Sequence, residues 1–168
     1  MENRPSIHEV LMRAAMLFAE RSTCVRIQTG AVIAIDNRIV STGYNGNAPG
    51  HEHCYEHFRN IWAQKHFSLT WEEYVQSETF KEEHREWSLV HELHGEANAI
   101  IYAAKKGTRI EGGTLYTTYS PCLSCMKSII SAGIVKVFYH TLYDRPEGRE
   151  SLEILKENDI EVFQILAL

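Results

Sequence analysis

The stretch GTLYTTYSPCLSCMKSIISAGIVKVFYH, residues 113–140, contains the signals for a strand, a helix and a second strand in immediate succession. Residues 113–118 (GTLYTT) have the β-branched and aromatic side chains of a short strand. Ser120 is expected to cap a helix that begins at Pro121 and ends at Gly133. Residues 134–140 (IVKVFYH) then form the next strand. A strand, helix and strand in this order predict parallel pairing through a right-handed crossover.

The N-terminal segment predicts a helix followed by a hairpin. SIHE, residues 6–9, is a capping box, and apolar residues at helical spacing extend from it to about Arg21. GAVIAI (residues 30–35) and RIVSTGY (residues 38–44) are expected to be antiparallel strands that are joined by a turn at Asp36-Asn37.

Further elements complete an alternating pattern. A helix is expected from His94 to the stop at Gly107, another around residues 150–157, and a last strand at residues 160–166. We therefore expect an α/β protein with three α-β-α layers, in which helices cover both faces of a mixed five-stranded sheet.

Two segments depart from the alternation. GYNGNAPG, residues 43–50, has glycines and a proline that indicate a loop. Residues 51 to about 90 are polar and rich in histidine, with helical pieces but no clear apolar stripe. We interpret this segment as an insertion, too polar to bury a core of its own, within a single domain of residues 1–168.

Bulk properties restrict the class of protein. The chain has 168 residues, of which 44% are hydrophobic and 23% are charged, as in globular proteins of one domain. It has neither a long uncharged apolar run nor a signal-like start, so we expect a cytoplasmic protein that does not contact a membrane. A net charge of −5 disfavours binding to a nucleic acid polymer, although a local basic pocket could still hold one phosphate. Four cysteines in a reducing compartment favour metal ligands or buried thiols over disulfides.

Two short motifs suggest a metal centre. His94 and Glu96 stand at a helix start, and Cys122 and Cys125 stand at another. Separately, each pair has an ordinary explanation, as a carboxylate at the positive helix end or as small buried thiols. Together, the histidine and the two cysteines could bind zinc and leave a fourth position open for water, whose pKa zinc lowers to about 7. Glu96 could then transfer protons.

The combination of H-x-E with P-C-x-x-C is the known signature of zinc-dependent nucleobase deaminases. In that reaction, water attacks the ring carbon that bears the exocyclic amine, the glutamate protonates the ring nitrogen and then the amine, and ammonia leaves.

The chain as a whole resembles the deoxycytidylate (dCMP) deaminase family, and particularly its phage-type members. The resemblance lies in STCVRIQTGAVIAIDNRIVSTGYNG, HREWS, HELHGEANAIIYAAKKG and TLYTTYSPCLSCMKSII. Deaminases of tRNA, riboflavin precursors and free cytosine share the zinc motifs, whereas STCxR, GYNG and EANAI favour the nucleotide enzyme. Gly95 departs from the family, which usually has alanine there, and we expect the difference to be tolerated.

This resemblance implies a cytidine deaminase-like fold and conversion of dCMP to dUMP and ammonia in pyrimidine deoxynucleotide synthesis. It also implies a homohexamer that dCTP with Mg²⁺ activates and dTTP inhibits, located in the host cytoplasm if the gene belongs to a phage. The candidate effector surface combines the hairpin turn with the GYNG loop, and comprises Asp36, Asn37, Gly43, Asn45 and Gly46.

Candidate substrate-binding residues are Asn45 of the GYNG loop, Arg26 for the phosphate, and Tyr119 and Ser120 beside the zinc cysteines. On the residues alone, the loop glycines also fit a tight turn, Arg26 a surface cation and Tyr119 a core position.

The resemblance further implies a second, structural zinc that orders the insertion, with the ligands Cys24, Cys54, His84 and Glu92. Other histidines compete as ligands, and unliganded thiols remain an alternative; the competing histidines are His51, His53, His57 and His91.

Two other functions stay open: a related deaminase that acts on dCTP, free cytosine or tRNA adenosine, and a noncatalytic zinc-stabilised protein that binds effectors. The negative charge disfavours tRNA as a substrate. The unliganded Glu96 disfavours a noncatalytic role, because a structural zinc has no use for such a carboxylate.

Overall fold

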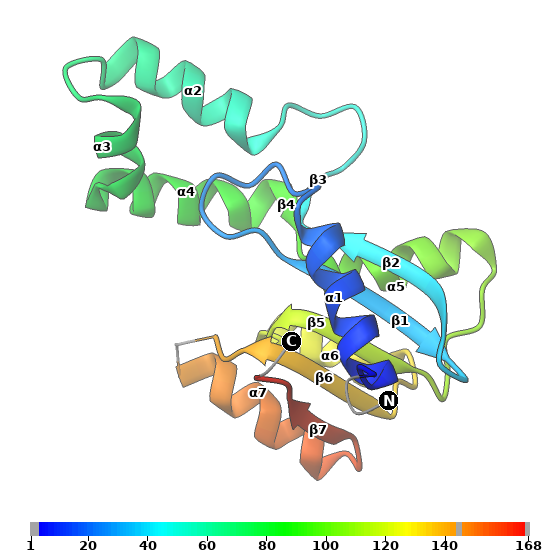
Figure 1. Cartoon of the computed structure of the whole chain (residues 1–168). Helices are drawn as coiled ribbons and strands as arrows, with labels where there is room; N and C mark the ends of the chain where they lie inside the picture. The colour runs from blue at the N-terminus through cyan, green and yellow to red at the C-terminus, as the bar shows by residue number, and fades with distance from the viewer. Residues whose placement is uncertain (1–3, 144–145, 167–168) are drawn as a thin grey trace.

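A mixed five-stranded sheet forms the centre of the molecule, with the strand order β2-β1-β5-β6-β7 (Figure 1). The computed structural model describes residues 4–143 and 146–166. β1 pairs antiparallel with β2 and with β5, whereas β5, β6 and β7 are parallel. The strands are β1 (Gly30–Ile35), β2 (Arg38–Tyr44), β5 (Thr114–Tyr119), β6 (Lys136–Thr141) and β7 (Glu161–Gln164). The predicted sheet is confirmed.

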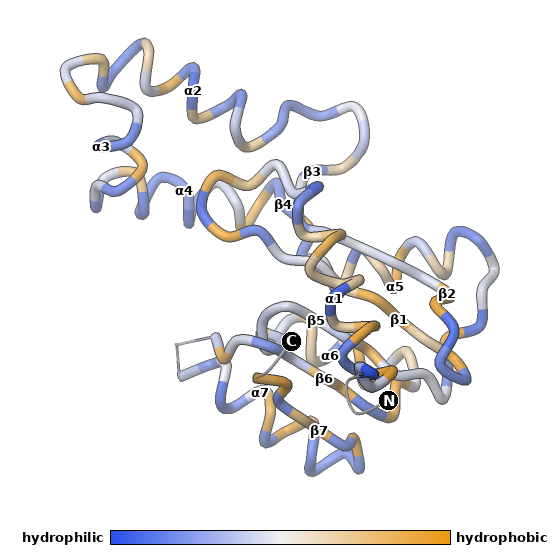
Figure 2. Tube along the Cα trace, viewed as in Figure 1, coloured by the Kyte–Doolittle hydropathy of each residue, from blue (hydrophilic) through white to orange (hydrophobic). Residues whose placement is uncertain are grey.

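Helices cover both faces of this sheet, as expected for three layers. One face packs against α1 (Ile7–Ala19), and the other packs against α5 (Gly95–Lys106), α6 (Leu123–Ser131) and α7 (Pro146–Glu157). Successive side chains of a strand point to opposite faces, so Val32 and Ala34 join the α1 core while Ala31 and Ile33 join the other. β1 is therefore buried on both sides, which explains its continuous apolar run (Figure 2).

Most predicted boundaries agree with the structure, and the start of α6 does not. α1 begins after the Ser6 capping box, and α5 ends at Gly107 in the left-handed conformation. The N-cap of α6 is Cys122, not Ser120, and Pro121 precedes the helix. Ser120 lies directly after β5 and binds the end of β6 instead, because its N–H donates to the Thr141 carbonyl and its hydroxyl accepts from the Tyr143 N–H.

The predicted loop at residues 43–50 contains a short strand that the sequence did not indicate. β3 (Gly46–Asn47) pairs antiparallel with β4 (Glu92–Leu93), which directly precedes His94. The GYNG segment is thereby attached to the residues that lead into α5.

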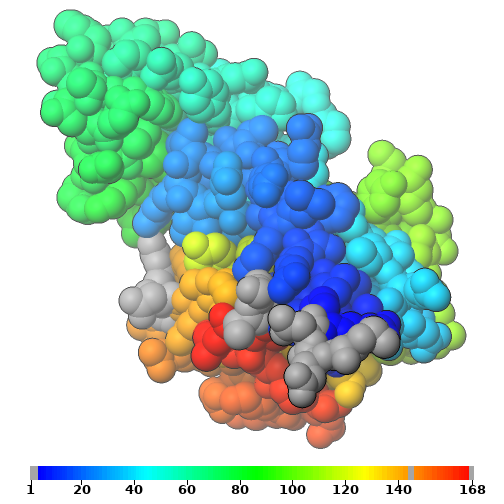
Figure 3. Space-filling model, in the orientation of Figure 1, coloured from blue at the N-terminus to red at the C-terminus, as the bar shows by residue number. Residues whose placement is uncertain are grey.

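The insertion forms three helices that project from the sheet as a lobe (Figures 1 and 3): α2 (Cys54–Lys65), α3 (Trp71–Gln76) and α4 (Glu78–His91). The expectation that this segment buries no core of its own was wrong, because Phe58, Tyr74 and Phe80 are each 0% exposed and pack with Cys24 and Cys54. Each of the three helices contributes only one or two large aromatic side chains to this core, which is too few to give a periodic apolar stripe in the sequence. Among the described helices, none has the length and apolar character needed to cross a membrane.

Gly43 should be necessary for the approach of α5 to β2. A Cβ at Gly43 would lie 2.3 Å from the Gly95 carbonyl oxygen and 2.4 Å from the Ala99 nitrogen, both of which are backbone atoms. We predict that Gly43→Ala lowers the free energy of unfolding by about 1–3 kcal/mol, measured by urea denaturation.

Gly95→Ala is the matched control for this prediction. Its Cβ would meet nothing closer than the Thr29 hydroxyl at 3.3 Å, so we expect a change within about 1 kcal/mol. Equal destabilisation by the two variants would contradict the close-approach explanation.

Candidate active site

Two helix N-termini meet at the candidate metal centre. His94 is the N-cap of α5 and Cys122 is the N-cap of α6, while Cys125 lies in the first turn of α6. The Nδ1 atom of His94 lies 3.3 Å from Cys122 Sγ and 3.5 Å from Cys125 Sγ. The three ligand atoms lie within 4.8 Å of one another. The structure thus brings together residues that are 28 and 31 positions apart in the chain.

The donor set and its spacing fit zinc. Around a tetrahedral zinc with Zn–S and Zn–N bonds of about 2.3 and 2.1 Å, a sulfur and a nitrogen are about 3.6 Å apart. The hydrogen bond with Cys125 and the contact with His94 lower the pKa of Cys122 to about 3, so its thiolate form is favoured. The contact with Cys122 in turn raises the pKa of His94 to about 9. Metal binding releases protons from its ligands. A divalent cation among these atoms would therefore replace the proton shared by His94 and Cys122.

Glu96 lies beside this centre without belonging to it. The group of possible ligands found among the described residues contains His94, Cys122 and Cys125 but not Glu96. The Glu96 side chain is 5% exposed, and burial raises the pKa of its carboxyl. It lines a cavity of about 530 Å³ together with the metal-site residues. An unliganded carboxylate in a cavity that ends at a three-ligand centre can exchange protons with a substrate held there.

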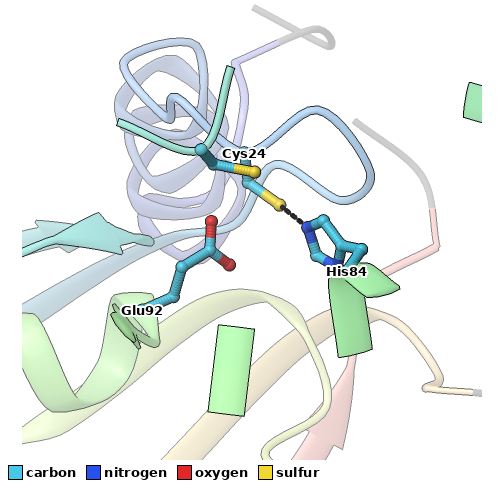
Figure 4. A group of neighbouring side chains, drawn as sticks. Cys24, His84 and Glu92 are labelled. Carbon is cyan, nitrogen blue, oxygen red and sulfur yellow. Dashed lines mark hydrogen bonds between the residues drawn. The ribbon is translucent and has the colours of Figure 1, made fainter. Parts of the chain in front are cut away.

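A second cluster joins the insertion to the body of the protein. Cys24 follows α1, Cys54 begins α2, His84 belongs to α4 and Glu92 to β4. The ligand atoms of these four residues lie within 4.8 Å of one another. Figure 4 shows Cys24, His84 and Glu92 pointing toward one another, with 3.2 Å between Cys24 Sγ and His84 Nε2.

The chemistry of this cluster also fits a metal ion. One carboxylate oxygen of Glu92 is buried and has no hydrogen-bond partner among the described residues. A bound cation would give this oxygen the partner that buried polar atoms normally have. Burial and the charge of Cys24 raise the pKa of Glu92 to about 7, and the hydrogen bond with Cys54 lowers the pKa of Cys24 to about 4. Four protein ligands make a closed site, in contrast to the three-ligand centre.

The competing histidines lie elsewhere in the structure. His53 caps α2, His57 pairs with Glu52 at 3.0 Å, and His91 stacks on Trp87. Neither these residues nor the exposed His51 belong to a group of possible metal ligands within the described ranges.

The predicted substrate-binding residues all line the 530 Å³ cavity, although two of them have structural contacts. Asn45 is buried, and its amide accepts from the Thr29 N–H and donates to the Ile27 carbonyl, both at 2.8 Å. Ser120 is buried and its hydroxyl accepts from Tyr143. Arg26 is exposed and Tyr119 is half-buried, so both are accessible from the cavity.

The predicted effector residues are not brought together within one chain. Asp36 and Asn37 form the hairpin turn with φ values of 48° and 62°, as a type I′ turn requires. Asn45 and Gly46 lie past the opposite end of β2, roughly 20 Å away along the strand. Gly43 is buried against α5 and is explained by packing.

Sequence reasoning missed several residues of the cavity wall. Thr29 has a buried hydroxyl without a hydrogen-bond partner in the described structure, and Arg85 follows the predicted ligand His84 directly. The adjacency of Arg85 to the HREWS histidine could have indicated it. Thr29 had no signal, because only the fold places it beside Gly95.

Comparisons with known proteins agree with this geometry. Residues 5–141 match the family model described as the cytidine and deoxycytidylate deaminase zinc-binding region. The deoxycytidylate deaminase of Enterobacteria phage T2 is 36% identical, over 92% of this chain and 90% of the relative. That of Enterobacteria phage T4 is 35% identical, over 92% and 88%. The crystal structure of the dCMP deaminase from cyanophage S-TIM5 in complex with dCMP and dUMP superposes with a TM-score of 0.70 and 29% identity, covering 97% of this chain and 99% of the other.

Metal analysis should find two zinc ions per chain. We predict that Cys54→Ser and Cys125→Ser each remove one of the two, because each takes a sulfur from a different cluster. Elemental analysis of the purified proteins measures the change.

Thermal unfolding distinguishes the two sites further. Cys54→Ser should lower Tm more than Cys125→Ser does, since the closed cluster joins the lobe to the body of the protein. One zinc in the wild-type chain, unchanged in Cys54→Ser, would eliminate the second site.

Proposed function

Because the chain belongs to the cytidine and deoxycytidylate deaminase family, we propose that it deaminates dCMP to dUMP and ammonia. The observation that carries the proposal is the buried, unliganded Glu96 beside a three-ligand centre on one cavity. The similarity to phage enzymes named deoxycytidylate deaminase, over most of both chains, supports dCMP over other substrates.

His94, Cys122 and Cys125 would hold the zinc ion. When bound, zinc supplies a water that loses its proton near neutral pH. The Glu96 carboxylate would take one proton of the attacking water and deliver it to the ring nitrogen of cytosine. It would then carry the second water proton, from the hydroxyl group now on the ring carbon, to the departing amine. The water oxygen becomes the carbonyl oxygen of dUMP, and the C–N bond to the amine breaks to release ammonia. The low exposure of Glu96 protects these transfers from bulk water.

Other residues of the cavity orient the nucleotide. Arg26, exposed at the cavity wall, would bind the phosphate, since a guanidinium can donate two parallel hydrogen bonds to it. Tyr119 would pack against the base. Asn45 acts by holding the segment from Ile27 to Thr29 in place, and Ser120 by fixing the chain before the zinc cysteines.

Regulation and assembly form a second part of the proposal. We propose a cytoplasmic homohexamer, activated by dCTP with Mg²⁺ and inhibited by dTTP, on the basis of the family resemblance. The pairing of β3 with β4 supports a role for the GYNG loop, because a ligand at that loop would act on the residues directly before His94. Asp36 and Asn37 would have to join such a site from another subunit.

A deaminase acting on dCTP, free cytosine or tRNA adenosine is the main alternative. Rates on dCMP, dCTP, cytosine and a tRNA stem-loop separate these substrates. A noncatalytic effector-binding protein would show no turnover of any of them.

Glu96→Gln should abolish most turnover while retaining the metal. We predict that kcat for dCMP falls by about 100-fold to 10,000-fold, because the amide cannot accept the proton. Ultraviolet absorbance of dCMP measures the rate, and elemental analysis checks the zinc content.

The control for this prediction is Glu150→Gln on the exposed face of α7, which should retain full activity. Turnover by Glu96→Gln equal to that of the wild type would overturn the role of Glu96. The same assay with dCTP and Mg²⁺ tests regulation separately.

Arg26→Ala should reduce discrimination between nucleotide and nucleoside. We predict that kcat/KM for dCMP falls about 10-fold to 100-fold while that for deoxycytidine is unchanged, because only dCMP has the phosphate. Steady-state kinetics on both substrates measure the ratio. An unchanged ratio would contradict the assignment.

A further inference from the structure

Two arginines from separate parts of the chain line the catalytic cavity. Arg26 lies in the segment between α1 and β1, and Arg85 lies on α4 of the insertion. Both are exposed, and neither forms a salt bridge with a carboxylate in the described ranges. Arg26 interacts with the Glu78 carboxylate only at longer range. Exposed guanidinium groups without a salt bridge are available to bind an anion.

The C-terminal half of α4 contributes to the cavity. Arg85, Ser88 and Leu89 line it at the three- and four-residue spacing of one helical face, and Glu92 of β4 follows directly after the helix. Leu89 is 81% exposed, although leucine is usually buried in a helix that only packs against its own lobe. The wall of the reaction cavity is therefore formed partly by the insertion.

The second cluster holds together the two backbone segments that carry these arginines. Arg85 directly follows His84, and Arg26 lies two residues after Cys24. The 3.2 Å contact between His84 Nε2 and Cys24 Sγ holds the two segments together (Figure 4). Because both contacting side chains are buried, the two backbones have little freedom to separate.

The charges of the cavity indicate which end of a ligand these arginines contact. Three carboxylates also line it: Glu92 belongs to the second cluster, Glu96 lies beside the catalytic centre, and Glu147 lies in the first turn of α7. Arg26 and Arg85 are close in sequence to Cys24 and His84 of the second cluster, whereas Glu96 lies beside the three-ligand centre. A ligand with a base at one end and a phosphate monoester at the other matches this distribution.

We propose that Arg85 binds the 5′-phosphate of the substrate together with Arg26, so that the helical insertion forms part of the nucleotide site. This inference rests on the proposed deamination of dCMP. It gives the insertion a role in substrate selection in addition to its attachment through the metal cluster.

Kinetics on matched substrates test the inference. Arg85→Ala should raise KM for dCMP by about 10-fold to 100-fold and change kcat by less than about threefold, because an ionic hydrogen bond to the phosphate is lost. Its kcat/KM for deoxycytidine should equal that of the wild type. Arg85→Lys should restore part of the affinity, since lysine keeps the charge but not the bidentate geometry.

Calorimetry supplies a readout that does not depend on turnover. Arg85→Ala should bind dUMP about 10-fold to 100-fold more weakly than the wild type and bind deoxyuridine equally well. Arg13→Ala, which removes an exposed arginine on α1 away from the cavity, is the control with the same charge change and should bind both ligands normally.

The outcomes separate this inference from the proposed function. The role of Arg85 would be overturned if Arg85→Ala kept the wild-type ratio of kcat/KM for dCMP to kcat/KM for deoxycytidine. This includes the case in which both values fall by the same factor. If Arg85→Ala does not fold, Arg85→Gln gives the same comparison, because it also removes the charge. A wild-type protein that does not deaminate dCMP would instead overturn the proposed function.

Discussion

The close contact between β2 and the first turns of α5 is the constraint on which the rest of the site depends. Gly43 lacks a side chain where the backbone of α5 crosses it, Ser41 donates a hydrogen bond to the Ala99 carbonyl at 2.6 Å, and Asn98 donates to the Tyr44 carbonyl at 2.8 Å. Sheet and helix are therefore joined by hydrogen bonds as well as by apolar packing. This contact fixes His94 at the start of α5 relative to the sheet, whose strand β5 leads to the cysteines of α6.

The segment between α1 and β1 connects the two clusters. Cys24 belongs to the closed cluster, Arg26 lines the catalytic cavity, and the backbone at Thr29 is bound by Asn45. A single short segment thus contacts the insertion, the substrate cavity and the loop after β2.

The two clusters differ in the number of ligands they offer and in the exposure of those ligands, the two properties that distinguish structural from catalytic metal sites. The cluster at the insertion offers four ligands, of which Cys24, Cys54 and His84 are buried. The centre at α5 and α6 offers three, with His94 exposed to the cavity and a carboxylate beside it. The same residue types would therefore serve two different roles in one chain under the proposed function, according to ligand number and access.

The sequence by itself determined the sheet, its covering helices and the grouping of His94 with Cys122 and Cys125, because these depend on local periodicity, caps and short motifs. The four residues of the second cluster are scattered along the chain, and only the resemblance to a family suggested them before the structure brought them together. The capping box at Ser6, the αL glycine at 107 and the H-x-E and P-C-x-x-C motifs are all local signals. Only the tertiary structure decided that β3 pairs with β4, that Phe58, Tyr74 and Phe80 form a core in the insertion, and that Arg85 lines the cavity. It also separated Asp36 and Asn37 from the GYNG loop, which a linear reading had grouped together. These features depend on contacts between side chains from segments that are far apart in the chain, and local sequence patterns do not indicate such contacts.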